Sequence, residues 1–586
     1  WNKAFEKAGF IDAIEVRFQE DDAQWDAEDV RYNTICWMTG EARYAIGPSR
    51  TNPLTGEIYD ADILVDSNWL RTFERQYAYY ADAAEKYRAA QDPADSLEAY
   101  LRQLNPRLAL EPQSAHADAP YQCDLARGLA EQMAIAAVAA DVNGDAPERR
   151  GIPREFIRQG LKELIMHELG HTLGLRHNFK ASSTIALADL HDTDVTGTKG
   201  LSGSVMDYNL VNIAPKGVKQ GHWFTPVLGA WDYLAIEFGY TQIAPASPGA
   251  RPDARNDEKT KLDEIAERAA HPQYAYGTDG DAAAGIDPLT NQRDMSDDLI
   301  GFAKQRTQIM TDLWDVLVEK LVKDGEGYQA ARSAFFYTLG DLVRAQYNAS
   351  RYIGGIEVRR NHRGDAGEQP LLDPVARALQ RRALAYLCEE VFSDAAYEFD
   401  PEFISKLGPE RWDHWGASEV ARFDLGLHDE VLAGQLGILN RIFSSNVLNR
   451  VQESSLYLDD GQLPFTIDEL YRETTTAIWS ELEENPGAQE WDAATPFISG
   501  FRRNLQRAYL KYILLSHTLN PSSSLPQDAR SAAWLELRGL AGRLHSLVDQ
   551  LDQANLALDA ASEAHLRESF ERATKALEAA FTMDTY

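Results

Sequence analysis

Hydrophobic and polar residues alternate in several short runs near the start of the chain. Residues 1–9 differ, because their apolar positions recur at the spacing of a short amphipathic helix. The alternating runs that follow predict β-strands at residues 14–18, 30–37, 42–46 and 57–66. Between the last two runs, residues 48–56 are rich in Pro, Gly, Asn, Ser and Thr, a composition typical of a loop. The pattern therefore predicts a small sheet in this part of the protein.

The following residues have mainly the periodicity of helices. Residues 70–150 are predicted to be largely helical, most clearly at 98–104 and 125–142. An insertion of this length could shape or cover a substrate groove, or it could be a structural support. A further apolar stripe begins at Phe156 and continues into His167, which predicts a long helix there.

Beyond residue 240 the sequence first becomes polar and then strongly helical. Residues 241–300 are rich in Pro and Asp, with one charged helix at 256–269, and we interpret residues 246–295 as a linker. Helical patterns then recur at residues 309–321, 328–348, 373–392, 430–449, 467–483, 496–518 and 529–581. One apolar face of the last run is marked by Leu540, Leu544, Leu547 and Leu551. These patterns divide the chain into a first domain at 1–245, the linker, and one or more α-helical domains at 296–586, arranged as a bundle or an α-solenoid.

One stretch of the first domain has the spacing of metal ligands. His167 and His171 are four residues apart, so on a helix their imidazoles can converge on one ion. Gly174 can adopt the left-handed conformation that ends a helix, and such a turn would let His177 return as a third ligand. Three protein ligands leave the fourth tetrahedral position of zinc open, as in catalytic sites. Glu168 follows the first ligand, the usual place of a general base that takes a proton from water.

This motif, HExxHxxGxxH, resembles the signature of the metzincin zinc proteases, which also have a methionine turn beneath the metal. The segment SVMDY, which begins at Ser204, fits that turn, so Met206 is expected to pack under the ligands without binding the ion. Asn178 stands where better-known metzincin subfamilies carry other residues. The wider stretch 1–240, with GPSRTNPLTGEIYDADI, HELGHTLGLRHNFKAS and WDYLAIEFGY, resembles a family of large bacterial zinc-dependent metalloproteases that are thought to be exported.

The resemblance implies an α+β fold class. It would consist of a metzincin-like catalytic domain, with a twisted mixed sheet and an active-site helix, followed by a large, mainly α-helical C-terminal region. Tyr208 resembles the tyrosine of astacins and serralysins, whose phenol can approach zinc and stabilise an oxyanion, although it could also simply pack.

In metzincins an exposed edge strand before the active-site helix binds extended substrate through its backbone. We assign this role to strand 56–65 or to strand 42–48, and an ordinary sheet strand is the alternative. The candidate substrate-binding residues of the first strand are Gly56, Ile58 and Ala61.

Composition and charge restrict the possible partners. The net charge of −33 argues against nucleic acid and anionic membrane surfaces, and no apolar run approaches the length of a membrane helix. The cysteines, Cys36, Cys123 and Cys388, are too few for a disulfide framework. Structural calcium is a weaker prediction, at the carboxylates of Asp60, Asp62, Asp279, Asp281 and Asp287. An arginine-rich stretch could bind a substrate carboxylate or form a salt-bridged face; it contains Arg351, Arg359, Arg360 and Arg363.

The sequence thus predicts a zinc-dependent endopeptidase that acts on a protein or peptide, with one catalytic zinc ion. One alternative is a peptidase restricted to short peptides, in which the insertion and the helical half close the cleft to folded proteins. Another is a binding or assembly protein with an inhibited zinc site. Export to the periplasm, cell surface or medium is expected from the family resemblance alone.

Overall fold

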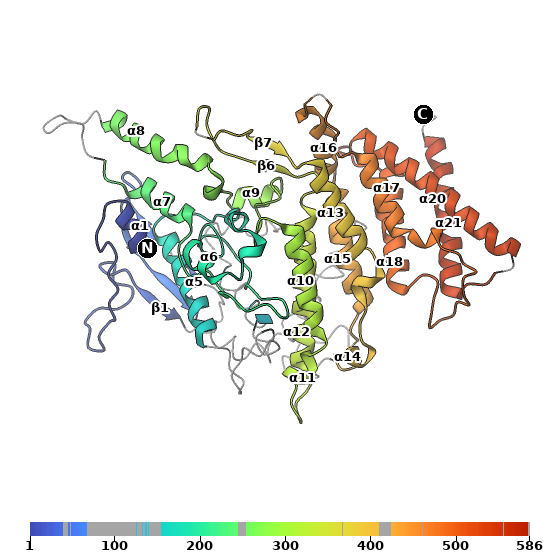
Figure 1. Ribbon diagram of the computed structural model, residues 1–586, viewed down its shortest axis with the longest axis horizontal. Helices are drawn as coiled ribbons and strands as arrows, with labels where there is room; N and C mark the ends of the chain where they lie inside the picture. Colours follow the sequence, from blue (N-terminus) through green and yellow to red (C-terminus); the bar gives the residue numbers. More distant parts are fainter. Residues whose placement is uncertain are drawn as a thin grey trace.

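The computed structural model describes most of the chain outside the 70–150 insertion. The described residues are 1–38, 45–46, 49–66, 154–243, 254–365, 367–408, 424–459, 461–554 and 556–583, with Leu125, Gln132, Ile135, Ala136 and Ala139 of the insertion. The molecule is elongated and follows its sequence from end to end, because the N-terminal strands lie at one end and the last helices at the other (Figure 1). Helices together with small sheets give the expected α+β class.

The strands of the N-terminal region form two small sheets. The first has the order β1–β5–β2, in which β1 (Ile35–Met38) runs parallel and β2 (Ala45–Ile46) antiparallel to the central β5 (Ile63–Asp66). The second is an antiparallel hairpin of β3 (Ser49–Thr51) and β4 (Ile58–Ala61). The first sheet is therefore mixed, as expected, but it is small.

Several strand predictions are corrected by the structure. Residues 14–18 are irregular, because Val16 and Phe18 are 78% and 96% exposed and their alternation covers no core. Of the predicted strand 30–37 only the end is extended, and the predicted loop 48–56 contains β3. The predicted turn at residues 39–40 lies outside the described residues.

The predicted strand 57–66 is in fact two strands, β4 and β5, that belong to different sheets. Asp62 lies between them, and its Oδ1 accepts hydrogen bonds from the N–H and the hydroxyl of Thr34 at 2.9 and 2.7 Å. The alternation of polar and apolar residues thus continues without a break where the chain passes from one sheet to the other. The N-terminal helix prediction, in contrast, is confirmed by α1 (Asn2–Lys7).

The long helix expected before the histidines is α5 (Arg154–Thr172). Its apolar stripe, which includes Phe156 and Leu164, is buried in a core that also contains Ile63 and Val65 of β5. Of the insertion, the predicted helix at 98–104 lies outside the described residues. The described positions of the predicted helix at 125–142 are helical. The same core extends to Phe335, far along the sequence.

The segment interpreted as a linker contains regular structure. It includes α8 (Ala254–Ala266), which fits the predicted charged helix, two short 3-10 turns and α9 (Asp279–Ala284). Its last part, residues 275–297, lies against the chain that follows α5. The division of the protein into domains stays a prediction, but this segment is closely packed on the histidine region.

The C-terminal half is mainly helical, as predicted. Its α-helices are α10 (Leu299–Trp314), α11 (Leu317–Leu321), α12 (Gln329–Ser350), α13 (Arg377–Glu390), α14 (Pro401–Ser405), α15 (Leu427–Ile442), α16 (Ser445–Glu453), α17 (Ile467–Ile478), α18 (Gly500–Tyr509), α19 (Ser516–Leu519), α20 (Gln527–Ala554) and α21 (Ala560–Met583). A π-helical segment, Leu510–Leu515, joins α18 to α19. The four leucines predicted to mark one face of the last region are buried along α20.

Two features of this half were not predicted. The run 529–581 is broken into α20 and α21, because Asp559 caps α21 by accepting the N–H of Ser562 at 2.9 Å. A β-hairpin of β6 (Ile356–Val358) and β7 (Leu372–Pro374) lies between α12 and α13 and extends over α9 (Figure 1).

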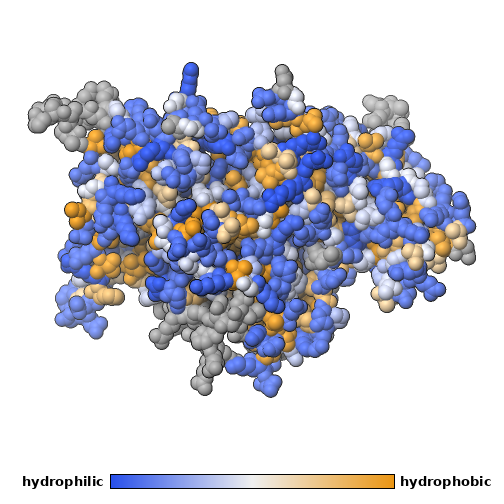
Figure 2. Space-filling model, in the orientation of Figure 1, coloured by the Kyte–Doolittle hydropathy of each residue, from blue (hydrophilic) through white to orange (hydrophobic). Residues whose placement is uncertain are grey.

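The surface in view is dominated by hydrophilic residues, with hydrophobic ones in small scattered patches (Figure 2). Such a surface suits the large net charge of −33. Among the helices that the structure describes, none combines the length and the apolar character needed to cross a membrane.

Candidate metal centre

Helix α5 carries His167, Glu168 and His171 on its last turns. The helix ends in a Schellman motif, since the N–H of Gly174 bonds the carbonyl of His171 at 2.9 Å and the N–H of Leu175 bonds that of Gly170 at 3.0 Å. Gly174 has a φ of +86°, a conformation that favours glycine. This turn returns the chain toward the helix, as the sequence predicted.

The turn brings His177 beside the two helical histidines. Possible ligand atoms of all three side chains lie within 4.8 Å of one another, and the Nε2 atoms of His171 and His177 are 3.2 Å apart. The described residues thus bring His167, His171 and His177 together as a group that could hold a metal ion.

Each imidazole is oriented by a partner at Nδ1. His167 meets the carbonyl of Val205 at 2.7 Å, His171 meets that of Leu175 at 3.0 Å, and His177 meets Oδ1 of Asp279 at 2.8 Å. Because these partners are acceptors, each Nδ1 carries the proton and each Nε2 keeps its lone pair for an ion.

The surroundings keep two of these histidines neutral. Burial, with the neighbouring His171 and His177, lowers the pKa of His167 well below its usual value. Burial and His177 lower the pKa of His171 to about 4. Neutral imidazoles are the form that binds metal, and imidazole nitrogen is a common donor to zinc.

The predicted methionine turn lies directly under α5. Met206 is fully buried, and a Cβ atom built on Gly170 would stand only 2.3 Å from its Sδ. The glycine of HELGH, Gly170, therefore lets the methionine approach the helix. The expectation that Met206 packs beneath the histidines agrees with this contact.

The turn is held by a carboxylate that the sequence did not single out. Asp232 of α7 (Ala230–Tyr240) accepts hydrogen bonds from the hydroxyl of Ser204 at 2.6 Å and from the N–H groups of Val205 and Gly229 at 2.9 and 2.8 Å. Burial raises the pKa of Asp232 to about 6, although these hydrogen bonds act to lower the pKa. Asp232 thereby fixes Val205, whose carbonyl orients His167.

Tyr208 lies at the histidine group, and Glu168 follows the first histidine on α5. The hydroxyl of Tyr208 is 2.9 Å from Nε2 of His177, so the phenol is beside the ligand that leaves the helix. Glu168 is fully buried next to His167 on α5. The roles predicted for Glu168 and Tyr208 stay predictions.

Asp279 is the other residue that sequence reasoning missed. The sequence indicates it only as a possible calcium ligand, whereas the structure places its carboxylate on His177, 102 residues earlier in the chain. Burial raises the pKa of Asp279, but its hydrogen bond with His177 brings the pKa down to about 2, so the carboxylate is ionised. No local signal in the sequence connects these two positions.

The structure gives no support to calcium at the five predicted carboxylates, because each faces a protein partner. Asp62 binds Thr34 and Asp279 binds His177, while Asp60, Asp281 and Asp287 lie at 3.9, 2.6 and 2.6 Å from Arg50, Arg360 and Lys180. The arginine-rich stretch is likewise salt-bridged in part, since Arg359 pairs with Glu357 and Asp373.

The three candidate substrate-binding residues lie away from the strand that packs on α5. Gly56, Ile58 and Ala61 belong to the β3–β4 hairpin, whereas β5 lies against the helix. The alternative strand, 42–48, is described only at β2, an outer strand of the three-stranded sheet. A role of either strand in substrate binding stays a prediction.

Comparison with known proteins agrees with this geometry. A search of curated proteins and a search of solved structures found no match. Residues 149–486 match the model of a family described as Met-zincin, and this match covers more than half of the chain. The matched region begins just before α5, includes the three histidines, the methionine turn and Asp279, and extends into the helical half. With its histidine triad above a buried methionine, the chain belongs to the Met-zincin family, whose name indicates a zinc-dependent peptidase.

Proposed function

We propose that the protein is a zinc-dependent endopeptidase. The observation that carries the proposal is the convergence of three imidazoles, whose possible ligand atoms lie within 4.8 Å of one another and whose Nδ1 atoms each face an acceptor. His167, His171 and His177 would hold zinc, which when bound supplies a Lewis acid that polarises the scissile carbonyl and acidifies water.

Glu168 is the proposed general base. It takes a proton from the attacking water and then gives a proton to the departing amine, so that peptide bond cleavage consumes one water molecule. Its position directly after the first histidine of the motif and its complete burial on α5 support this role.

Tyr208 is the proposed electrophilic partner. Its hydroxyl would donate a hydrogen bond to the oxyanion that develops on the scissile carbonyl. The 2.9 Å separation between this hydroxyl and Nε2 of His177 supports the role, because it places the donor at the histidine group.

The proposal is tested with an unfolded protein and a peptide library as substrates. Replacing Glu168 by Gln keeps the shape of the side chain and removes the base, so zinc content should stay at one per chain while cleavage falls at least about 100-fold. Glu155→Gln is the matched control, because Glu155 lies on the same helix but is exposed and pairs with Arg158.

Three outcomes separate the alternatives. Loss of cleavage in Glu168→Gln and with a chelator, but not in Glu155→Gln, supports the endopeptidase. Cleavage of the peptides alone would indicate a peptidase restricted to short chains. A wild-type protein that holds one zinc ion and cuts neither substrate would overturn the proposed activity.

The compartment is part of the same proposal. Export rests on the resemblance to exported bacterial metalloproteases, and fractionation of cells that produce the complete gene product tests it. Recovery of the protein only from the cytoplasm would contradict export without affecting the proposed chemistry.

A further inference from the structure

The chain that carries the third histidine pairs with a segment about one hundred residues later. The N–H of Phe179 bonds the carbonyl of Gly277 at 2.6 Å, and the carbonyl of Phe179 accepts the N–H of Asn291 at 2.9 Å. Asn178 adds its side-chain amide, which donates to the carbonyl of Ala275 at 2.9 Å and accepts the N–H of Gly277 at 3.1 Å. The backbone next to His177 is thus set by this distant segment.

His177 differs from the other two histidines in what orients it. His167 and His171 belong to α5 and their Nδ1 atoms face backbone carbonyls, whereas His177 lies outside the helix and faces the carboxylate of Asp279. Its ring also stacks on Phe179, with 4.9 Å between the ring centroids. The position of this ring therefore depends on side chains that come from elsewhere in the sequence.

Asp279 is not needed to cap its own helix. The N-terminal cap of α9 is a capping box made by Thr278 and Asp281, in which Oδ2 of Asp281 accepts the N–H of Thr278 at 2.8 Å. Oδ1 of Asp279 bonds His177, while Oδ2 accepts the hydroxyl of Thr278 at 3.1 Å and lies 3.7 Å from Arg176.

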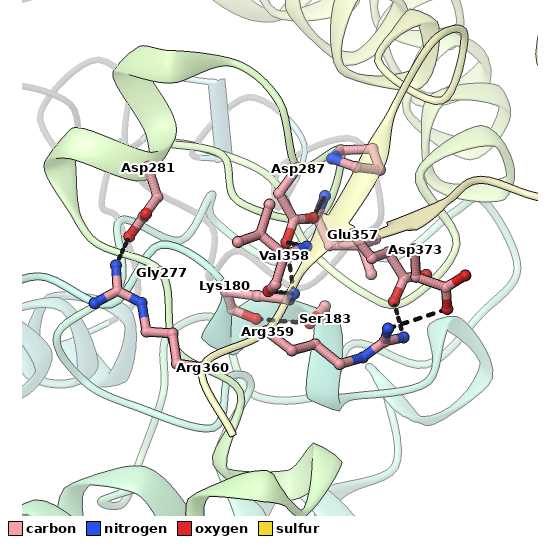
Figure 3. A network of polar contacts seen from close by, with 12 residues as sticks. Lys180, Ser183, Gly277, Asp281, Asp287, Glu357, Val358, Arg359, Arg360 and Asp373 are labelled. Atoms are coloured by element: carbon pink, nitrogen blue, oxygen red, sulfur yellow. Dashed lines mark hydrogen bonds and ion pairs between the residues drawn. The ribbon is translucent and has the colours of Figure 1, made fainter. Parts of the chain in front are cut away.

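The β6–β7 hairpin holds α9 in this position (Figure 3). Arg360, just beyond β6, donates to Oδ2 of Asp281 at 2.6 Å. The buried pair of Lys180 and Asp287 lies at 2.6 Å, and Val358 bonds both members, with its N–H to Asp287 at 3.0 Å and its carbonyl to Lys180 at 3.1 Å. One hairpin thus joins the segment after His177 to the segment that carries Asp279.

We propose that Asp279 is a positioning residue for the metal ligand His177, and that the β6–β7 hairpin keeps it in place through α9. This inference rests on the proposed function, since it takes His177 as a zinc ligand. A carboxylate at Nδ1 fixes the tautomer and the orientation of the ring and makes Nε2 a stronger donor. Removing such a partner lowers metal affinity by about 10- to 100-fold.

The test measures metal binding directly. Zinc affinity is determined by competition with a coloured chelator, the ligand field by the visible spectrum of the cobalt-substituted protein, and folding by the melting temperature of the metal-free protein. Asp279→Ala should lose about 10- to 100-fold in zinc affinity and shift the cobalt spectrum. Asp279→Asn, whose amide oxygen can still accept the Nδ1 proton, should lose less.

Two further variants separate positioning from a general effect on folding. Asp373→Asn removes one carboxylate from the same hairpin, at its pair with Arg359, and should leave zinc affinity and the cobalt spectrum at wild-type values. Asp281→Asn weakens the contact with Arg360 and should give a loss between those of Asp373→Asn and Asp279→Ala.

The outcomes distinguish this inference from the proposed function. If Asp279→Ala and Asp279→Asn bind zinc as tightly as Asp373→Asn, with an unchanged cobalt spectrum, Asp279 does not position the ligand and the inference is wrong. If Asp279→Ala does not fold, Asp279→Asn alone decides by the same comparison. If the wild-type protein binds no zinc, the proposed function fails first and the inference fails with it.

Discussion

Replacing Asp232 tests how the methionine turn is held. Asp232→Ala leaves the N–H groups of Val205 and Gly229 without their acceptor in a fully buried place. Asp232→Asn keeps an oxygen for both groups, and its amide can donate to the hydroxyl of Ser204. Both variants lack the ionisable group, so they differ mainly in those two N–H groups. At about 1–3 kcal/mol for each, Asp232→Ala should be about 2–6 kcal/mol less stable locally than Asp232→Asn.

The same residue should give the wild-type protein a characteristic pH dependence. Its pKa is raised by burial to about 6, from 3.8 in the unfolded chain, so the folded state holds the proton to higher pH. The corresponding stability is fully present below pH 3.8 and is lost as the pH rises through 6, because the unfolded state then binds fewer protons. The loss amounts to about 3 kcal/mol, and Asp232→Asn should not show it.

Native-state hydrogen exchange, read by mass spectrometry on peptides from residues 200–235, reports the local opening free energy that these predictions concern. The measurement is made between pH 4 and 8 and corrected for the intrinsic exchange rate at each pH. Equal opening free energies in the Ala and Asn variants would refute the role of the two N–H groups. The assignment of the pH dependence to Asp232 would be refuted if the opening free energy of the wild type rose from pH 4 to 6. It would also be refuted if the opening free energy of Asp232→Asn fell as much as that of the wild type.

Two further predictions concern Tyr208 and the C-terminal bundle. Tyr208→Phe should lower kcat about 100- to 1000-fold and leave zinc affinity unchanged, as for an oxyanion donor that is not a ligand; unchanged turnover would show that the phenol only packs. Burial in the bundle lowers the pKa of His565, which bonds Gln506 at 2.7 Å, to about 3. The unfolded chain binds this proton at higher pH, so the bundle should lose stability as the pH falls from 6.5 toward 3. Urea unfolding of the wild type and His565→Gln checks this, and equal acid sensitivity would contradict it.

The local part of the site was predictable from the sequence. The spacing of His167 and His171, the glycine at 174 and the return of His177 are consequences of helix geometry and of one turn, and the structure has all of them. The methionine turn was identified through family resemblance, and its place under α5 agrees with the contact between Met206 and Gly170.

The partners that orient the site could not be predicted in this way. Asp232 and Asp279 are single carboxylates in ordinary helices, and each acts on a residue that lies 27 or more positions away in sequence. In the sequence Asn178 stands out only as a departure from other subfamilies. In the structure its side chain makes hydrogen bonds with Ala275 and Gly277 of the distant segment. Such contacts depend on the three-dimensional fold, and the pattern of residues in a single sequence does not show which distant positions meet.

Secondary structure was predicted best where the periodic pattern is long. The leucine face of α20 is an example, because the ten buried positions of that helix keep to one helical face along its length. Short alternating runs were less reliable: Val16 and Phe18 have the pattern of a strand but remain exposed, and Asp62 divides a run between two sheets. The break between α20 and α21 was not predicted, although Asp559 is a typical N-cap residue for the start of α21.

The pairing of residues 177–185 with residues 275–297 has a consequence for synthesis of the protein. A growing chain that has emerged as far as residue 245 already contains every histidine of the triad, but it contains neither Asp279 nor Asn291, which bond His177 and Phe179. His167 and His171 reach their positions when α5 forms. The orientation of His177, in contrast, depends on contacts with residues far along the sequence, and such contacts form late in folding. If the triad holds zinc as proposed, a partly made chain that lacks Asp279 and the hairpin at 356–374 would bind the ion more weakly than the finished protein.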